Sequence, residues 1–358
     1  MKRIIITIAT AAVCVFGAKA QDAQTAAAEA AAALSAAEDV PVVAPKPKYW
    51  DLSMQNNINF GQTFLYQWAA GGYNNYSLAA GIDANANYAK GKMVWNNRLQ
   101  LDYGFLYSAD KPIIQKNKDR IYFESKWGYE TPIQHLYYSA NLDFRTQFNN
   151  NYEYGTPASD GNTEPTQQQW LDARVLKSGF LAPAYFNVGL GLKWTPKPWF
   201  ELNFAPLTGG VVLVNIPSLR YTYGMDLIEG STYSDRKEAF LAEQTANNYD
   251  QFKGVRYEFG AQLKADAKWV INEVFTYTTQ LTAFYNYLTP KVEPRITWDN
   301  KVFWKLAKYF ALTLSTNLIY DPLVMVKDND GDKVPDAKGI QFKEYFEFGF
   351  TYTIAGKK

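Results

Sequence analysis

Apolar and polar residues alternate with a period of two from about residue 50 to the end of the chain. The pattern is clearest over residues 76–89, where one face carries Tyr76, Leu78, Ala80, Ile82, Ala84, Ala86 and Tyr88. The intervening positions include Ser77, Asp83, Asn85 and Asn87. Because alternate side chains of a β-strand point to opposite faces, this segment predicts a ribbon with one apolar face and one polar face. The apolar face would meet a second sheet in a soluble sandwich, and lipid in a transmembrane barrel.

The alternation predicts about twelve strands. They lie near residues 52–65, 76–89, 93–107, 119–129, 136–148, 184–194, 200–208, 255–269, 274–287, 296–306, 309–320 and 342–354. Every second connection is short, and several of the others are long, among them 108–118, 149–183 and 209–254. Short periplasmic turns, long extracellular loops and an even strand number are typical of bacterial outer-membrane barrels. We therefore predict an all-β fold, an antiparallel transmembrane β-barrel of about twelve strands, with fourteen as the open alternative.

Aromatic residues support the barrel over the sandwich. They make up 16% of the chain, with 26 Tyr and 10 Trp. The predicted inner strand ends carry Trp95, Trp127, Trp194, Trp199, Trp269 and Trp304, and the predicted outer ends carry Tyr76, Tyr107, Tyr285, Tyr287 and Tyr320. Transmembrane barrels place aromatic girdles at both membrane interfaces. The two sets therefore predict two girdles in contact with outer-membrane lipid.

The N-terminus has the blocks of a secretory signal peptide. Lys2 and Arg3 precede an apolar run over residues 4–17, and Ala18 and Ala20 are small residues before the expected cleavage site. The predicted organisation is a signal peptide over 1–20, an Ala/Pro-rich periplasmic tail over 21–49 and an outer-membrane barrel domain over 50–358. Removal of the signal leaves 33 basic residues against 35 acidic ones. This balance gives no indication of a nucleic-acid partner.

The last strand places Phe346, Phe348, Phe350, Tyr352 and Ile354 on one face. It resembles the C-terminal strand that the outer-membrane assembly machinery recognises, so we expect that machinery to be a partner. The four residues 355–358 follow, whereas such strands usually finish on an aromatic residue. Other protein partners are unknown at this stage.

Several short motifs resemble an uncharacterised family of bacterial outer-membrane β-barrels, domain-of-unknown-function family 3078. They are Gln67-Trp68-Ala69-Ala70-Gly71-Gly72, Trp95 with Tyr103-Gly104, Phe144-Arg145-Thr146-Gln147-Phe148, Ala205-Pro206-Leu207-Thr208-Gly209 and Gln341-Phe342-Lys343-Glu344. The resemblance covers essentially all of residues 50–354 and implies the barrel fold. It implies no activity and no functional residue.

Charged residues of both signs lie on the polar strand faces, where they would line the lumen. The candidate constriction comprises Asp83, Arg98, Asp102, Arg120, Glu124, Asp143 and Arg145. If Lys90-Gly91 forms a two-residue hairpin turn, Asp83 lies directly opposite Arg98. We expect opposite charges to pair across the interior, to narrow it and to leave little net selectivity for anions or cations. The same pairs could instead hold the barrel closed.

An enzyme is not expected. The twelve-stranded barrel invites comparison with the outer-membrane phospholipase, which needs a serine activated by a histidine at the outer rim. The single histidine, His135, lies in a predicted periplasmic turn at the opposite end, without a serine arrangement of that type. We interpret it as an ordinary turn residue.

The last external loop carries a motif that resembles acidic calcium repeats. Its candidate ligands are the carboxylates of Asp328, Asp330, Asp332 and Asp336, with the carbonyl of Val334. These hard oxygens have the spacing of a calcium loop, but the motif occurs once and lacks the bidentate glutamate. The alternatives are a weak Ca²⁺ site and a solvated turn.

Two other loops give weaker signals. Residues 149–183 have few apolar anchors and predict a flexible surface loop. Within 209–254, residues 235–247 have helical character, with Asp235 and Glu238 in a capping-box arrangement and Phe240 and Leu241 as apolar contacts. We expect this helix to rest on the rim, with a lid over the mouth as the alternative.

The combined expectation is a non-enzymatic outer-membrane barrel that forms a narrow channel for small solutes. The alternative is a closed structural or interaction barrel whose extracellular loops bind a partner protein or surface glycan. A polar lumen is compatible with both.

Overall fold

The structure is a computed structural model, and it describes residues 49–66, 73–158, 164–326 and 339–355. The predicted signal peptide lies outside the described residues, as does the predicted tail except for Tyr49. The candidate calcium loop at 328–336 and the motif at 67–72 lie outside them as well.

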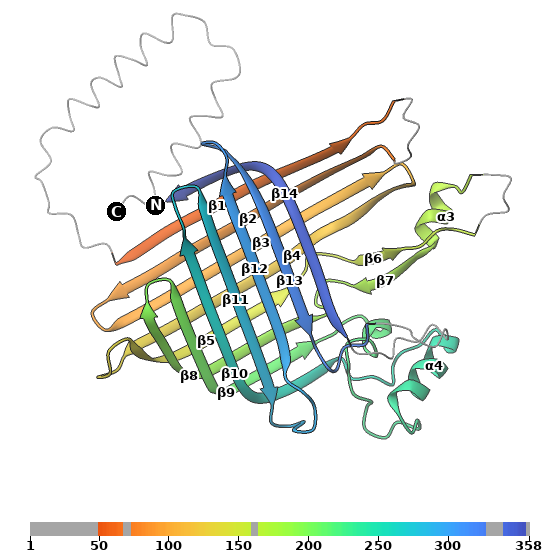
Figure 1. Cartoon of the computed structure of the whole chain (residues 1–358). Helices are drawn as coiled ribbons and strands as arrows, with labels where there is room; N and C mark the ends of the chain where they lie inside the picture. The colour runs from red at the N-terminus through yellow and green to blue at the C-terminus, as the bar shows by residue number, and fades with distance from the viewer. Residues whose placement is uncertain (1–48, 67–72, 159–163, 327–338, 356–358) are drawn as a thin grey trace, which may run out of the picture. The chain divides into compact units, whose positions relative to one another are not determined.

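Twelve antiparallel strands close into one barrel (Figure 1). They are β1 (Trp50–Thr63), β2 (Asn75–Lys90), β3 (Met93–Ser108), β4 (Lys111–Glu130), β5 (Leu136–Thr146), β8 (Ala184–Lys197), β9 (Phe200–Leu213), β10 (Val255–Val270), β11 (Phe275–Asn286), β12 (Arg295–Lys305), β13 (Phe310–Tyr320) and β14 (Ile340–Ala355). Each strand pairs with the next one of this set, and β1 pairs with β14 from Ser53↔Ala355 to Asn59↔Gly349. The predicted fold class is confirmed.

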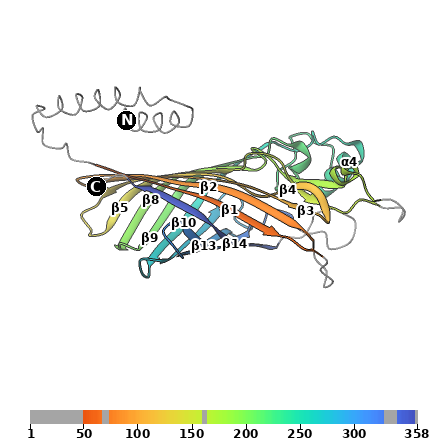
Figure 2. The ribbon, with the colours of Figure 1, turned by 90° about the horizontal axis from the view of Figure 1, so that it is seen from above.

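Connection lengths alternate as predicted. At the end where β1 begins, which we call the turn end, the connections are 91–92, 131–135, 198–199, 271–274 and 306–309. At the opposite end, the loop end, four of the six connections exceed ten residues. Figure 2 shows α4 (Arg236–Ala246) and the tip of the β3–β4 hairpin at the same end of the barrel. The longest connections therefore gather at one end.

The predicted loop over residues 108–118 is wrong, because β4 begins at Lys111 and pairs with β3 beyond the predicted strand. The extension has a support that the sequence did not reveal. The backbone N–H of Lys116 donates to the Tyr154 hydroxyl at 2.9 Å, and the ammonium of Lys111 donates to the Tyr154 carbonyl at 2.8 Å. Tyr154 belongs to the connection between β5 and β8, so residues that are distant in sequence support the extension of the β3–β4 hairpin.

The prediction of a flexible loop over 149–183 is also wrong. This segment contains β6 (Asn151–Tyr154) and β7 (Arg174–Ser178), which form a separate two-stranded sheet, and helix α3 (Gln167–Asp172). Thr166 and Gln169 form a capping box at the start of α3, and Trp170 is buried. A single buried tryptophan and a cap supply the anchors that the polar composition concealed.

The helix predicted near 235–247 is observed as α4. The Asp235 carboxylate accepts from the backbone N–H of Glu238 at 2.8 Å, whereas the Glu238 carboxylate accepts from Ser234 rather than from Asp235. These bonds from Ser234 lower the pKa of Glu238. The Phe240 ring stacks on Tyr221 with centroids 4.4 Å apart, while Leu241 is exposed. Of the predicted capping box, the bond to Asp235 is therefore confirmed and the bond to Glu238 is wrong. Of the two predicted apolar contacts, that of Phe240 is confirmed and that of Leu241 is wrong.

Truncation of Phe240 tests the packing of α4. Phe240→Ala is expected to destabilise the cluster of Tyr221, Ala239, Phe240 and Phe252 by about 3–5 kcal/mol, because it empties the centre of a buried contact. Amide hydrogen exchange in residues 217–253 should accelerate while exchange in the barrel strands is unchanged. Leu241→Ala, one residue away and exposed, is the control and should have little effect. Equal acceleration in both variants would contradict this packing.

The outer surface of the barrel is apolar, as the predicted faces require. Leu78 and Leu99, both predicted to face lipid, are 38% and 36% exposed. Trp50 lies 5.7 Å from Trp95 at the turn end, and Tyr76 stacks on Tyr107 at 5.1 Å at the loop end. Aromatic side chains thus form contacts along both edges of the apolar band.

No helix in the described part of the chain is both long and apolar enough to cross a membrane.

Candidate functional site

The barrel interior is divided into two halves. One half, along β4, β5, β8, β9 and β10, is filled by polar side chains that are at most 9% exposed. They include Glu124, Lys126, Ser139, Asn141, Asn187, Lys193, Asn203, Thr208, Glu258, Gln262 and Lys264. We call this region the filled half. Buried polar groups need hydrogen-bond partners, and the contacts below supply them for several of these residues.

Ion pairs in the filled half join strands that are not neighbours. The Lys126 ammonium on β4 lies 2.7 Å from Asp266 on β10 and 3.1 Å from Glu201 on β9. Glu124 on β4 binds Lys264 on β10, and it also accepts from the Tyr122 hydroxyl at 3.1 Å. Since β5, β8 and β9 lie between β4 and β10 in the sheet order, these pairs cross the interior.

Part of a loop docks on the lumen at the loop end. The Arg256 guanidinium on β10 donates to the carbonyls of Tyr223 and Gly224, at 3.1 and 2.8 Å. The backbone N–H of Met325 donates to the Thr222 carbonyl at 2.9 Å, which joins two loops. It is therefore the segment at 220–225, rather than α4 itself, that enters the mouth. Helix α4 packs on this segment through Phe240 and Tyr221.

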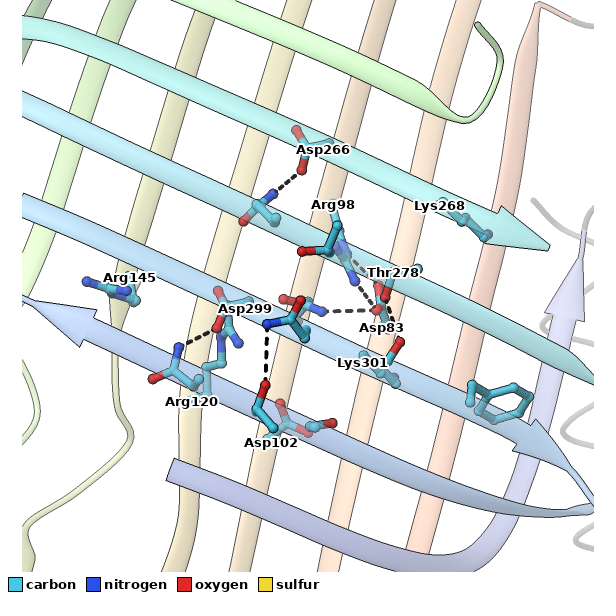
Figure 3. A pocket seen from close by; sticks show the side chains of 18 of the residues that line it. Asp83, Arg98, Asp102, Arg120, Arg145, Asp266, Lys268, Thr278, Asp299 and Lys301 are labelled. Atoms are coloured by element: carbon cyan, nitrogen blue, oxygen red, sulfur yellow. Dashed lines mark hydrogen bonds and ion pairs between the residues drawn. The ribbon is translucent and has the colours of Figure 1, made fainter. Parts of the chain in front are cut away.

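The other half of the interior holds a cavity of about 1130 Å³. Its walls come mainly from β1, β2, β3 and β11 to β14, and we call it the open half (Figure 3). Lining residues extend from His135 and Thr195 at the turn end to Tyr223 and Asp321 at the loop end. A space for water therefore runs along most of the length of the barrel, beside the filled half.

The predicted register of the β2–β3 hairpin is wrong by two residues. The turn is Gly91-Lys92, with Lys90 opposite Met93, so Asn85 lies opposite Arg98. Gly91 has φ 55°, which glycine adopts without strain, and it therefore takes the first position of the turn.

The predicted ion pair of Asp83 and Arg98 nevertheless forms, diagonally. The Arg98 guanidinium donates to both carboxylate oxygens, at 3.0 and 2.6 Å, and the Gln100 amide donates at 3.0 Å. A long side chain can span the diagonal between neighbouring strands.

The remaining predicted constriction residues are divided between the halves. Asp102, Arg120 and Arg145 line the cavity, together with Asp83 and Arg98, whereas Glu124 lies in the filled half. Asp143 accepts from the Asn187 amide at 3.0 Å, away from the large cavity. The structure therefore does not bring the seven residues into one ladder.

Their partners come from distant strands. Lys118 lies 3.6 Å from Asp102 and 3.0 Å from Glu347 on β14. Arg120 lies 3.9 Å from Asp299 on β12, and the Arg145 guanidinium lies over the Tyr185 ring at 4.9 Å. Lys118 was missed because residues 108–118 were assigned to a loop. The period-two spacing of Lys116, Lys118 and Arg120 was the signal that could have placed it.

Two other sequence predictions concern single sites. His135 lies in the β4–β5 connection with φ 64°, and its carbonyl accepts from the backbone N–H of Thr195 at 2.9 Å. This position agrees with the predicted turn. Within the described residues, no cluster of three or more His, Cys, Asp or Glu side chains could hold a metal ion. The calcium prediction falls on undescribed residues and stays a hypothesis.

The chain was compared with known structures. An outer-membrane channel from Pseudomonas putida F1 is 8% identical, with 89% of this chain and 99% of that chain covered and a TM-score of 0.33. The translocator domain of the autotransporter NalP from Neisseria meningitidis is 7% identical, with 92% and 97% covered and a TM-score of 0.35. The toluene transporter TodX from Pseudomonas putida is 8% identical, with 87% and 90% covered and a TM-score of 0.28.

The chain was also compared with protein families and with curated proteins. No curated protein matches it. The family described as "Protein of unknown function (DUF3078)" matches residues 60–152, from the end of β1 to β6. The family recognised from sequence motifs is therefore the one whose model matches, over residues 60–152 of the closed twelve-stranded antiparallel barrel, while the wider resemblance over residues 50–354 stays a prediction.

Proposed function

We propose that this protein is an outer-membrane barrel that forms a narrow channel for small solutes. The observation that supports it best is the cavity of about 1130 Å³ with a polar lining in the open half. Barrels of eight strands are filled by side chains, and those of sixteen or more leave a wide aqueous channel. A twelve-stranded barrel with one filled half is an intermediate case, which favours a narrow path.

The outer surface supports the membrane location. An apolar band lies between aromatic girdles, which is the arrangement of transmembrane barrels. The end with long loops would then face outside and the turn end would face the periplasm.

A second function is favoured by the docked segment at 220–225. Because Arg256 holds its carbonyls at the mouth, the barrel could be closed and act through its loops. The folded elements at the loop end, β6, β7, α3 and α4, would then bind a partner protein or a surface glycan.

Conductance of the purified barrel in planar bilayers separates the two functions. The wild type is expected to give small, discrete conductance steps. Arg120→Ala with Arg145→Ala is expected to raise the conductance and shift selectivity towards cations, since two long cationic side chains leave the cavity and Asp299 loses its ion pair. Lys308→Ala removes a cation from a turn outside the cavity lining and is the control. Silence of the wild type and of the double variant would favour the closed barrel.

A further inference from the structure

The carboxylates of the open half are all paired. Eight acidic residues line the cavity, and each has a carboxylate oxygen within 4.0 Å of a lysine or arginine nitrogen. They are Asp83, Asp102, Asp119, Glu201, Asp266, Asp299, Asp321 and Glu347. Their negative charge is therefore largely compensated before any solute enters.

Not every cation of the same cavity is matched in this way. Arg145, Lys268 and Lys301 line it, and none of them has a carboxylate oxygen of a described residue within 4.0 Å. The Arg145 guanidinium lies over the Tyr185 ring, 4.9 Å from its centroid, and has no described carboxylate at ion-pair distance. The sequence predicted balanced lumen charges because only the numbers of acidic and basic residues could be compared. The structure shows which of these residues form ion pairs.

These three cations lie at successive depths. Arg145 is one residue from the end of β5 at the loop end, Lys301 lies near the middle of β12, and Lys268 lies two residues from the end of β10 at the turn end. Figure 3 shows the same order, with Arg145 and Lys268 on opposite sides of Lys301. The open half therefore carries cations without a carboxylate at ion-pair distance along its length, although Lys301 still interacts electrostatically with Asp83 and Asp102.

We propose that Arg145, Lys301 and Lys268 form a track that binds small anions, such as carboxylates or phosphate, and makes the channel anion-selective. This inference rests on the proposed channel function for its transport role, and on the ion-pair geometry alone for anion binding. A unit charge at about 4 Å in water changes the local concentration of a monovalent ion about fivefold. Successive sites let an anion move along the barrel without leaving the favourable field.

Reversal potentials in a gradient of potassium chloride test the selectivity. At low ionic strength, where charges are least screened, chloride should permeate at least about fivefold better than potassium in the wild type, because a positive charge enriches the anion and depletes the cation. Arg145→Gln, Lys301→Gln and Lys268→Gln together should abolish or reverse that preference while steps are still observed. Lys308→Gln, which removes the same charge outside the cavity, should leave it unchanged. A conducting wild type without anion preference would overturn the inference and leave the channel intact.

A binding measurement keeps the inference testable if the barrel is silent. Calorimetric titration of the detergent-solubilised full barrel with inorganic phosphate should give saturable heat that is lost in the triple variant and retained in Lys308→Gln. Binding without conductance would support the anion track and refute the channel. The absence of both phosphate binding and anion preference would overturn the track.

Discussion

Lys126→Ala is expected to reduce the free energy of unfolding by about 3–5 kcal/mol, the cost of removing one partner of a buried ion pair. The Lys126 ammonium lies within 4.0 Å of three carboxylates, those of Glu124, Glu201 and Asp266. Its removal leaves Asp266 without that ion pair and increases repulsion among the three acids. The loss should appear in urea unfolding of the barrel in detergent or bilayers.

Lys268→Ala on the same strand as Asp266 is the matched control. Lys268 is exposed and has no described carboxylate within ion-pair distance, so its loss should change stability little. Equal stability of the Lys126 and Lys268 variants would mean that the filled half is not held by its ion pairs. In that case, water in the lumen would satisfy these carboxylates instead.

Leu99→Arg is expected to cost about 2–4 kcal/mol when the barrel is folded in bilayers. Leu99 points outward between Trp95 and Tyr103, which are exposed on the same face of β3, so the arginine would lie within the apolar band. There it finds no water and no partner. Unfolding equilibria in lipid vesicles measure the cost.

Gln55→Arg is the control for that substitution, since Gln55 lines the cavity opposite Asp83. The new charge would lie in water beside a carboxylate and should be tolerated. If Leu99→Arg folded as well as Gln55→Arg, the assignment of the two strand faces would be wrong.

The strands and their faces could be predicted because the residues of each strand alone show its alternation of apolar and polar positions. The period of two fixes which side chains face outward. Because each face of a strand meets a single environment, the alternation continues along the whole strand. All twelve barrel strands were found this way, and Asp83 and Arg98 were placed on the same face. Their register was not, because it depended on whether Lys90 or Gly91 opened the turn.

The arrangement of the lumen could not be predicted, for a different reason. Lys126 and Asp266 are 140 residues apart and meet only because the closed sheet brings β4 towards β10. No local pattern records which charges face each other across a barrel. The same holds for Tyr154, whose contacts with Lys111 and Lys116 extend the β3–β4 hairpin.

The central claim is that solutes pass through the open half and not through the filled half. Two near-isosteric variants test it in the mature barrel, because the single native cysteine, Cys14, lies in the predicted signal peptide. Ser315 lines the cavity, whereas Ser139 is 5% exposed in the filled half. Ser315→Cys should react with a charged methanethiosulfonate reagent and lose conductance on modification, while Ser139→Cys should neither react nor change. Block at Ser139→Cys, or modification of Ser315→Cys without any change in conductance, would contradict the proposed path.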